Sequence, residues 1–192
     1  LLYTVVAHNQ AHGFGTFWEP RYSQLGFAGL THFHEHPPLV FGIQGAWFRL
    51  FGDAFWVERA YCLFTAALAA GLIMAIWRDQ WAEVTKERKL AWWPVLLWII
   101  IPPVHWSLRN NMQENTMAIF CLAAIWCVVR GLERDRNTLL PALLAGLFTL
   151  AAVLSKGPPG AYPLAAPVIW SMFNRDVRWL RSISFLTVMA LS

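Results

Sequence analysis

Charged side chains are scarce in this sequence of 192 residues, of which only 14% are Asp, Glu, Lys or Arg. A soluble domain carries about 25% of these residues. Hydrophobic residues instead make up 57% of the chain, and the mean hydropathy is +0.43. The shortage of charge therefore excludes an ordinary soluble domain and indicates a protein that spans a membrane.

Cysteine is also rare, and each of Cys62, Cys121 and Cys127 lies inside an apolar run. They show neither a pairing framework nor a metal-ligand spacing, so we interpret them as small buried hydrophobic residues. The net charge of +4 comes from basic residues in short loops between apolar runs, not from a basic patch. We therefore expect no nucleic acid partner.

The sequence lacks an initiating Met and an apolar N-terminal run long enough to cross a membrane. We therefore expect it to be an excerpt of a longer chain. In that longer chain, an upstream segment would carry residues 1–52 across the membrane.

Long apolar runs dominate the rest of the sequence, and a spanning helix needs about 20 such residues. The predicted fold class is all-α: a polytopic transmembrane bundle of about six helices over residues 53–192, preceded by an extracytoplasmic loop over residues 1–52. Short membrane-surface helices are expected in that loop, one of them over Val40–Phe51. The predicted spans are Phe55–Trp77, Leu90–Trp106, Met117–Val129, Leu139–Leu154, Ala161–Phe173 and Leu180–Ser192.

The distribution of Lys and Arg predicts the orientation, because cytoplasmic loops of membrane proteins are rich in both. Ten of the 15 basic residues fall in one set of loops, namely Arg78, Lys86, Arg88, Lys89, Arg130, Arg134, Arg136, Arg175, Arg178 and Arg181. These loops are predicted to be cytoplasmic. Residues 1–52 and the turns near residues 107–113 and 155–160 then share the outer face, in an integral membrane protein in contact with lipid.

The segment Thr31–Leu39 is rich in histidine and ends in a Pro pair. In an extended run His32, His34 and His36 would share one face, because side chains alternate. With the neighbouring carboxylate, this pattern is one hypothesis for a divalent metal site, with Glu35, His34 and His36 as ligands. The other interpretation is a polar loop whose His residues form local hydrogen bonds.

Three further ionisable residues, Arg109, Glu114 and Lys156, are predicted at the same outer face. Ionisable residues at a membrane are candidates for function. Glu114 has a structural interpretation too, as an acid in the first turn of a helix, where it compensates the helix dipole. Lys156 could simply extend its ammonium to the membrane interface. The alternative is that Gly157 and the Pro pair after it form a rigid turn that orients the ammonium.

Three segments, in this order, resemble the lipid-donor glycosyltransferases of the GT-C superfamily, nearest to bacterial protein O-mannosyltransferases and aminoarabinose transferases. Glu35 to Leu39 is similar to that family's acidic-basic-Pro-Pro-Leu motif, although its basic residue is often Lys and here is His36. The first segment continues with Phe51–Asp53 and Glu58–Arg59. The second is Asn111–Phe120, and the third is Leu154–Pro158.

The resemblance implies an inverting enzyme that moves a sugar from a polyprenyl-phosphate donor to a lipid, glycan or protein acceptor. Its site would lie on the extracytoplasmic face of a bacterial inner membrane. The implied catalytic residues are Glu35 and Glu114, and the implied substrate-binding residues are Tyr3, His36, Arg109 and Lys156. The family's base, an Asp shortly before a Tyr, would fall before Leu1. We therefore expect residues 1–192 alone to transfer no sugar.

Two other functions are compatible with the composition. A transporter would place paired charges in the middle of its spans, whereas here the polar residues gather at one face and spans two to four are apolar at their centres. A non-enzymatic membrane subunit could use the His-rich outer loop to bind metal.

Overall fold

The computed structural model describes residues 2–22, 29–81, 84–133, 138–173 and 179–192. Over these residues the fold is all-α, as predicted, with two isolated β-bridges, Gly15–Pro20 and Arg21–His32, in the outer loop. The helices are α1 Leu2–Ala11, α2 Leu39–Phe51, α3 Phe55–Gln80, α4 Thr85–Lys89, α5 Trp92–Ile99, α6 Pro102–Arg109, α7 Gln113–Glu133, α8 Leu139–Lys156, the 3-10 helix η1 Pro158–Ala165, α9 Ala166–Phe173 and α10 Trp179–Leu191.

Three of the described helices, α3, α7 and α8, are long and apolar enough to cross a membrane. At 1.5 Å per residue their 26, 21 and 18 residues extend about 27–39 Å, which matches a hydrocarbon core of about 30 Å. Large apolar side chains such as Leu63 on α3 and Leu147 on α8 are exposed. Outward-facing leucines on spanning helices belong in lipid, so the protein is an integral membrane protein.

The second predicted span is not one continuous helix, and that prediction is wrong. Residues Leu90–Trp106 divide into α5 and α6, with a break at Ile101, whose backbone is extended (φ −66°, ψ 120°). Pro102 and Pro103 open α6. Proline has no N–H to continue the preceding helix, and it forces the residue before it out of the helical region. The Pro pair therefore breaks the span instead of ending it.

The fifth predicted span also contains a change of helix type. Pro158–Ala165 is a 3-10 helix with Pro163 inside it, and the chain becomes α-helical only at Ala166. The sixth predicted span corresponds to α10, which packs against α8 and α9.

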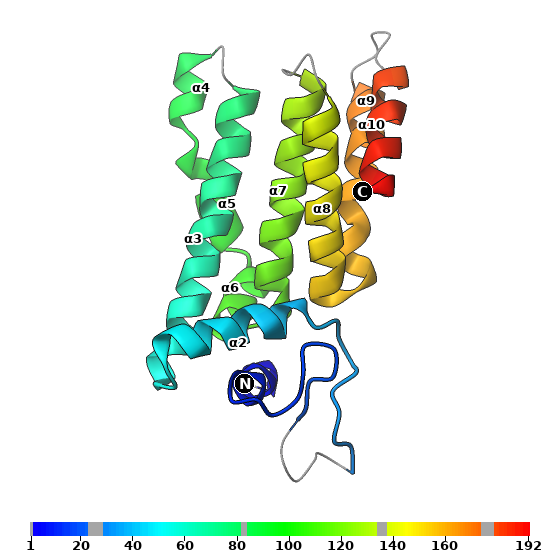
Figure 1. Ribbon diagram of the computed structural model, residues 1–192. Coiled ribbons are helices and arrows are strands. Elements are labelled where there is room, and N and C mark those ends of the chain that lie inside the picture. The colour runs from blue at the N-terminus through cyan, green and yellow to red at the C-terminus, as the bar shows by residue number, and fades with distance from the viewer. Residues whose placement is uncertain (1, 23–28, 82–83, 134–137, 174–178) are drawn as a thin grey trace.

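The spanning helices stand side by side, with α2 lying across one end of the bundle and α1 beneath it (Figure 1). The C-terminal ends of α3 and α7 lie at the opposite end, as does α4 with its basic residues Lys86, Arg88 and Lys89. The basic side predicted from the sequence is thus opposite the α1–α2 layer. Arg134, Arg136, Arg175 and Arg178 lie outside the described residues.

A small aromatic core fastens the α1–α2 layer, which the sequence predicts to be the outer layer, to the bundle. Phe33 from the loop, Phe41 and Phe48 from α2, and Val6 from α1 are buried together with Val57 of α3. The sequence predicted α2 almost to the residue, because its apolar run is amphipathic and too short to span. It did not locate α1, whose polar and apolar residues show no clear helical periodicity.

Asn111, in the turn between α6 and α7, connects this layer to the bundle. Its backbone is left-handed (φ 48°), a conformation that Asn tolerates better than most residues. Its buried amide exchanges hydrogen bonds with Gln44 of α2, at 3.2 and 3.1 Å, and donates to the hydroxyl of Thr4 on α1 at 3.0 Å. One side chain therefore joins α1, α2 and the start of α7.

We expect Asn111→Ala to lower the free energy of unfolding by about 1–3 kcal/mol. The substitution leaves the buried Gln44 amide without its hydrogen-bond partner, and alanine tolerates the left-handed conformation less well than asparagine. Thermal unfolding of the full-length protein in detergent would measure the loss. Asn110→Ala is the control, since its amide bonds only to the Trp106 carbonyl in the same turn. Equal effects of the two variants would contradict the linking role of Asn111.

Candidate functional site

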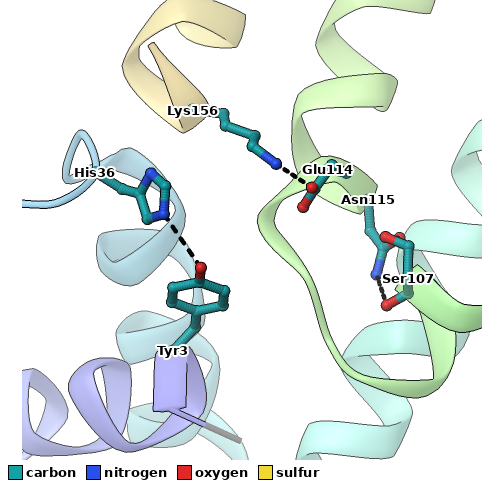
Figure 2. Close-up of polar contacts among 6 residues, drawn as sticks. All are labelled: Tyr3, His36, Ser107, Glu114, Asn115 and Lys156. Carbon is teal, nitrogen blue, oxygen red and sulfur yellow. Dashed lines mark hydrogen bonds and ion pairs between the residues drawn. The ribbon is translucent and has the colours of Figure 1, made fainter. Parts of the chain in front are cut away.

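Lys156 and Glu114 form an ion pair at the end of the bundle that faces α1 and α2 (Figure 2). Lys156 is the last residue of α8, and Glu114 lies in the first turn of α7. Gly157, with φ 88°, ends α8 and turns the chain sharply after the lysine. Both side chains keep access to solvent, with 24% of Lys156 and 35% of Glu114 exposed. The pair therefore lies at the surface of a half-open site, where a ligand can reach both charges.

A second polar pair, Tyr3 and His36, comes from the outer layer. The Tyr3 hydroxyl lies 3.1 Å from Nε2 of His36 (Figure 2). The Tyr3 ring packs edge-on against Phe33. Pro37, next to His36, lies close to Gly157. The loop that carries His36 therefore approaches the end of α8 that carries Lys156.

Glu35 is held by a residue that the sequence did not point to. The hydroxyl of Tyr22 donates a hydrogen bond of 2.5 Å to Oε1 of Glu35. This bond, together with burial, raises the pKa of Tyr22 to about 12, so the phenol keeps its proton. Tyr22 lies in the outer loop, far from any recognisable motif, and only the folded chain brings it to Glu35.

The charges of these groups act on one another. Burial lowers the pKa of His36, as does the nearby ammonium of Lys156, while Glu35 and Glu114 act in the opposite direction. The same two carboxylates, together with burial, raise the pKa of Tyr3. His36 is therefore a neutral hydrogen-bonding group near pH 7, unlike the lysine often found at this place in the motif.

The lowered pKa of His36 makes stability depend on pH. As the pH falls through the ordinary value near 6.5, the unfolded chain binds the proton before the folded chain does, so the folded state loses stability. We expect the unfolding temperature to fall more between about pH 7.5 and 5.5 in the wild type than in His36→Gln. His105→Gln, which removes an exposed His on α6, should behave like the wild type. A smaller or equal fall in the wild type would contradict the shift.

Two predicted site residues, Arg109 and His34, make no hydrogen bond or ion pair with Tyr3, His36, Glu114 or Lys156 among the described residues. The guanidinium of Arg109 is exposed and makes no hydrogen bond or ion pair within the described residues; the Arg109 carbonyl instead accepts a hydrogen bond from Arg59 at 2.5 Å. His34 is exposed and stacks on His32 with ring centroids 5.8 Å apart. Arg109 lies at the predicted face, but its side chain is not aimed at Lys156 by any contact.

The three predicted metal ligands do not converge. Glu35 turns to Tyr22 and His36 turns to Tyr3, so their ligand atoms and that of His34 form no cluster of the size a metal requires. Within the part of the chain that the structure describes, the one such cluster is His8, His12 and Asp53. The alternation assumed for residues 32–36 holds for His32 and His34, which stack on one side while Phe33 is buried. The chain bends at Glu35 and His36, so His36 does not join them.

Glu114 also borders an apolar cavity of about 260 Å³ between α3, α5, α6 and α7. Its walls include Trp98, Val104 and Trp106. Ser107 and Asn115 exchange hydrogen bonds of 2.7 and 3.0 Å in this wall (Figure 2). The break between α5 and α6 places the aromatic side chains here. The site thus combines a charged pair with an apolar recess on the side of the spanning helices.

Gln113, just before Glu114, is buried, yet neither polar atom of its amide has a hydrogen-bond partner in the described structure. A buried amide without partners is costly. No pattern in the sequence distinguishes it from the polar residues around it.

The chain belongs to the dolichyl-phosphate-mannose-protein mannosyltransferase family, whose model matches residues 35–192. This result confirms the superfamily indicated by the motifs at Glu35, Glu114 and Lys156. A search of the curated proteins gave no match.

Two solved structures share the fold. Both are ArnT from Cupriavidus metallidurans, one bound to undecaprenyl phosphate (18% identity, TM-score 0.73, covering 98% of this chain) and one in the apo state (19% identity, TM-score 0.75, covering 99%). The present chain spans about a third of their length, at 34% of each. At this identity the likeness establishes the fold, which is that of a membrane-embedded GT-C protein.

Proposed function

We propose that this chain is part of a membrane glycosyltransferase that moves a sugar from a polyprenyl-phosphate donor to an acceptor at the extracytoplasmic face of a bacterial inner membrane. The observation that carries the proposal is the convergence of Lys156 and Glu114, from two spanning helices, with Tyr3 and His36 from the layer across their ends. Family membership and the fold shared with an undecaprenyl-phosphate-bound protein support it.

Lys156 is the proposed ligand of the donor phosphate. Transfer of the sugar leaves negative charge on the lipid phosphate, and a fixed ammonium stabilises that charge as it develops. Before the donor arrives, Glu114 balances the ammonium. When the phosphate binds, it competes with Glu114 for Lys156, and the released carboxylate is free to accept a hydrogen bond from the sugar or the acceptor.

The outer layer supplies neutral hydrogen-bonding groups. The Tyr3 hydroxyl and the His36 imidazole are both uncharged near pH 7, so they can orient the phosphate or sugar without adding charge. Glu35, held by Tyr22, is the proposed carboxylate that fixes this side of the site. The proton acceptor for the attacking group is proposed to be an Asp preceding Leu1 in the full-length protein. Arg109 would have to change its side-chain conformation to reach the phosphate.

The apolar cavity beside Glu114 is the proposed entrance for the isoprenoid tail. Its aromatic and aliphatic walls face the spanning helices, and its polar border is the carboxylate of the charged pair. A lipid phosphate would thereby have its tail among apolar side chains and its head near Lys156. A metal at Glu35, His34 and His36 has no support in the side-chain positions, and no step is assigned to it.

The test is sugar transfer by the full-length protein, purified and returned to lipid vesicles with radiolabelled polyprenyl-phosphate sugars. We expect label to move from at least one such donor to a lipid, glycan or protein acceptor, and none to move with residues 1–192 alone. Transfer by the fragment would refute the assignment of the base to the preceding segment. Absence of binding of any polyprenyl phosphate to the full-length protein would refute the proposed function.

A further inference from the structure

A cluster of metal-ligating side chains lies in the outer layer, apart from the contacts that join Tyr3, His36, Glu114 and Lys156. The cluster consists of His8 and His12 on α1 and Asp53 in the turn between α2 and α3. Nε2 of His8 lies 3.2 Å from Oδ1 of Asp53, and Nε2 of His12 lies 3.0 Å from the same oxygen. The family motifs in the sequence include Asp53 but neither histidine.

The two His–Asp distances are close to the spacing of ligand atoms in a tetrahedral metal site. Zinc binds imidazole nitrogen and carboxylate oxygen at about 2.0–2.1 Å, which puts neighbouring ligand atoms of a tetrahedron about 3.3 Å apart. All three ligand atoms lie within 4.8 Å of one another. His8 and His12 are one helical turn apart, the spacing at which two side chains share a helix face. A small closure of the three groups around one ion would satisfy all of them.

The backbone around the cluster is already fixed. Gly52, with φ 81°, makes the turn that presents Asp53, a conformation natural to glycine. Arg49 of α2 donates hydrogen bonds to the carbonyls of Gln10, at 2.9 Å, and Ala11, at 3.0 Å, which holds the end of α1 against α2. Its guanidinium is thereby engaged with carbonyls beside His12, and no ion pair between it and Asp53 is formed among the described residues.

The surroundings favour a cation and leave room for a fourth ligand. The three side chains are 40%, 52% and 49% exposed, so an ion and a water can enter from solvent. His8, Asp53 and Glu58 line one pocket of about 300 Å³. One carboxylate oxygen of Glu58 is buried and has no hydrogen-bond partner within the described structure. The two carboxylates, Asp53 and Glu58, bring negative charge to this corner.

We propose that His8, His12 and Asp53 bind one Zn²⁺ ion, with water as the fourth ligand. The ion links α1 to the turn before α3, and so fastens the layer that carries Tyr3 to the first spanning helix. Imidazole with carboxylate suits zinc among the available divalent metals. Since the ligands are arranged independently of any sugar or lipid, the proposal does not depend on the proposed function.

The test uses the full-length protein purified in detergent without a polyhistidine tag. After chelation and removal of the chelator, Zn²⁺ is titrated against a fluorescent zinc competitor. We expect one equivalent to bind. His8→Gln, His12→Gln and Asp53→Asn should each weaken zinc binding by at least roughly 10–100-fold, which is the loss caused by removing a residue that only hydrogen-bonds to a metal ligand. His32→Gln, which changes an outer-loop His outside the cluster, should leave the affinity unchanged.

Cobalt gives a second measurement that does not depend on variants. Co²⁺ bound in place of zinc to the wild-type protein should show the strong visible absorption of a four-coordinate site, and Zn²⁺ should displace it. Unchanged zinc affinity in the His8 and His12 variants, or loss of binding in His34→Gln with retention in His12→Gln, would overturn the proposal. So would a wild-type protein that binds no zinc at micromolar concentration.

Discussion

Replacing Lys156 with Ala should slow sugar transfer by the full-length protein by about 10²–10³-fold, the loss seen when one fixed donor to a developing charge is removed. Lys156 is largely buried at the end of α8, and among the described residues its ammonium pairs with Glu114. In the proposed function, removal of the ammonium takes away a cation that stabilises the negative charge on the departing lipid phosphate. The measurement is the initial rate with a polyprenyl-phosphate sugar at saturating and limiting donor, which separates kcat from KM.

A double variant tests whether Lys156 binds the donor phosphate or only neutralises the charge of Glu114. If Lys156 only neutralised Glu114, the double variant Lys156→Ala with Glu114→Gln would recover activity, because no unpaired carboxylate would remain. If Lys156 binds the phosphate, Lys156→Ala and the double variant both lose affinity for polyprenyl phosphate, whereas Glu114→Gln alone retains it. Lys156→Arg should retain part of the activity because it keeps the charge but not its position. Lys89→Ala, an exposed cation at the opposite end of the bundle, should change nothing.

The gross architecture could be predicted because apolar runs of spanning length need no tertiary information. The third and fourth predicted spans lie within α7 and α8, and α2 was recognised by its short apolar run. The Pro pair after Ile101 predicts that a helix stops there. It does not predict whether the span ends at that point or continues after a break. Which of these occurs depends on whether residues 102–109 pack back against α3 and α7, as they do here.

The site was predictable residue by residue only where a motif marked it. Glu114 and Lys156 were expected at one face, and the structure pairs them across two helices. Their pairing depends on the relative rotation of α7 and α8, which no local pattern encodes. Tyr22 could not be foreseen either, because its contact with Glu35 depends on how the segment before α2 folds. Sequence proximity suggested His34 and His36 as metal ligands, whereas folding gathers His8 and His12 with Asp53, more than forty residues away in the chain.

The close contact between η1 and α8 should make Gly160→Ala one of the most destabilising single substitutions in the bundle. Gly160 is buried, and a Cβ there would overlap the backbone of Ala152 and Val153 on α8. Backbone cannot move aside as a flexible side chain can, so we expect a loss of about 3 kcal/mol, the upper part of the range for overpacked cores. Cys121 of α7 also contacts the Gly160 carbonyl.

Gly71→Ala is the matched control, because a Cβ at Gly71 in α3 would meet nothing within 4 Å. Alanine is the better helix former by about 1 kcal/mol, so this variant should be neutral or slightly more stable. Thermal unfolding of both full-length variants in detergent gives the comparison. Since η1 begins one residue after the Gly157 turn, Gly160→Ala should also displace the end of α8 and reduce transfer through Lys156. A Gly160→Ala protein as stable as Gly71→Ala would contradict the close contact between η1 and α8, and unchanged transfer would show that η1 does not hold Lys156 in place.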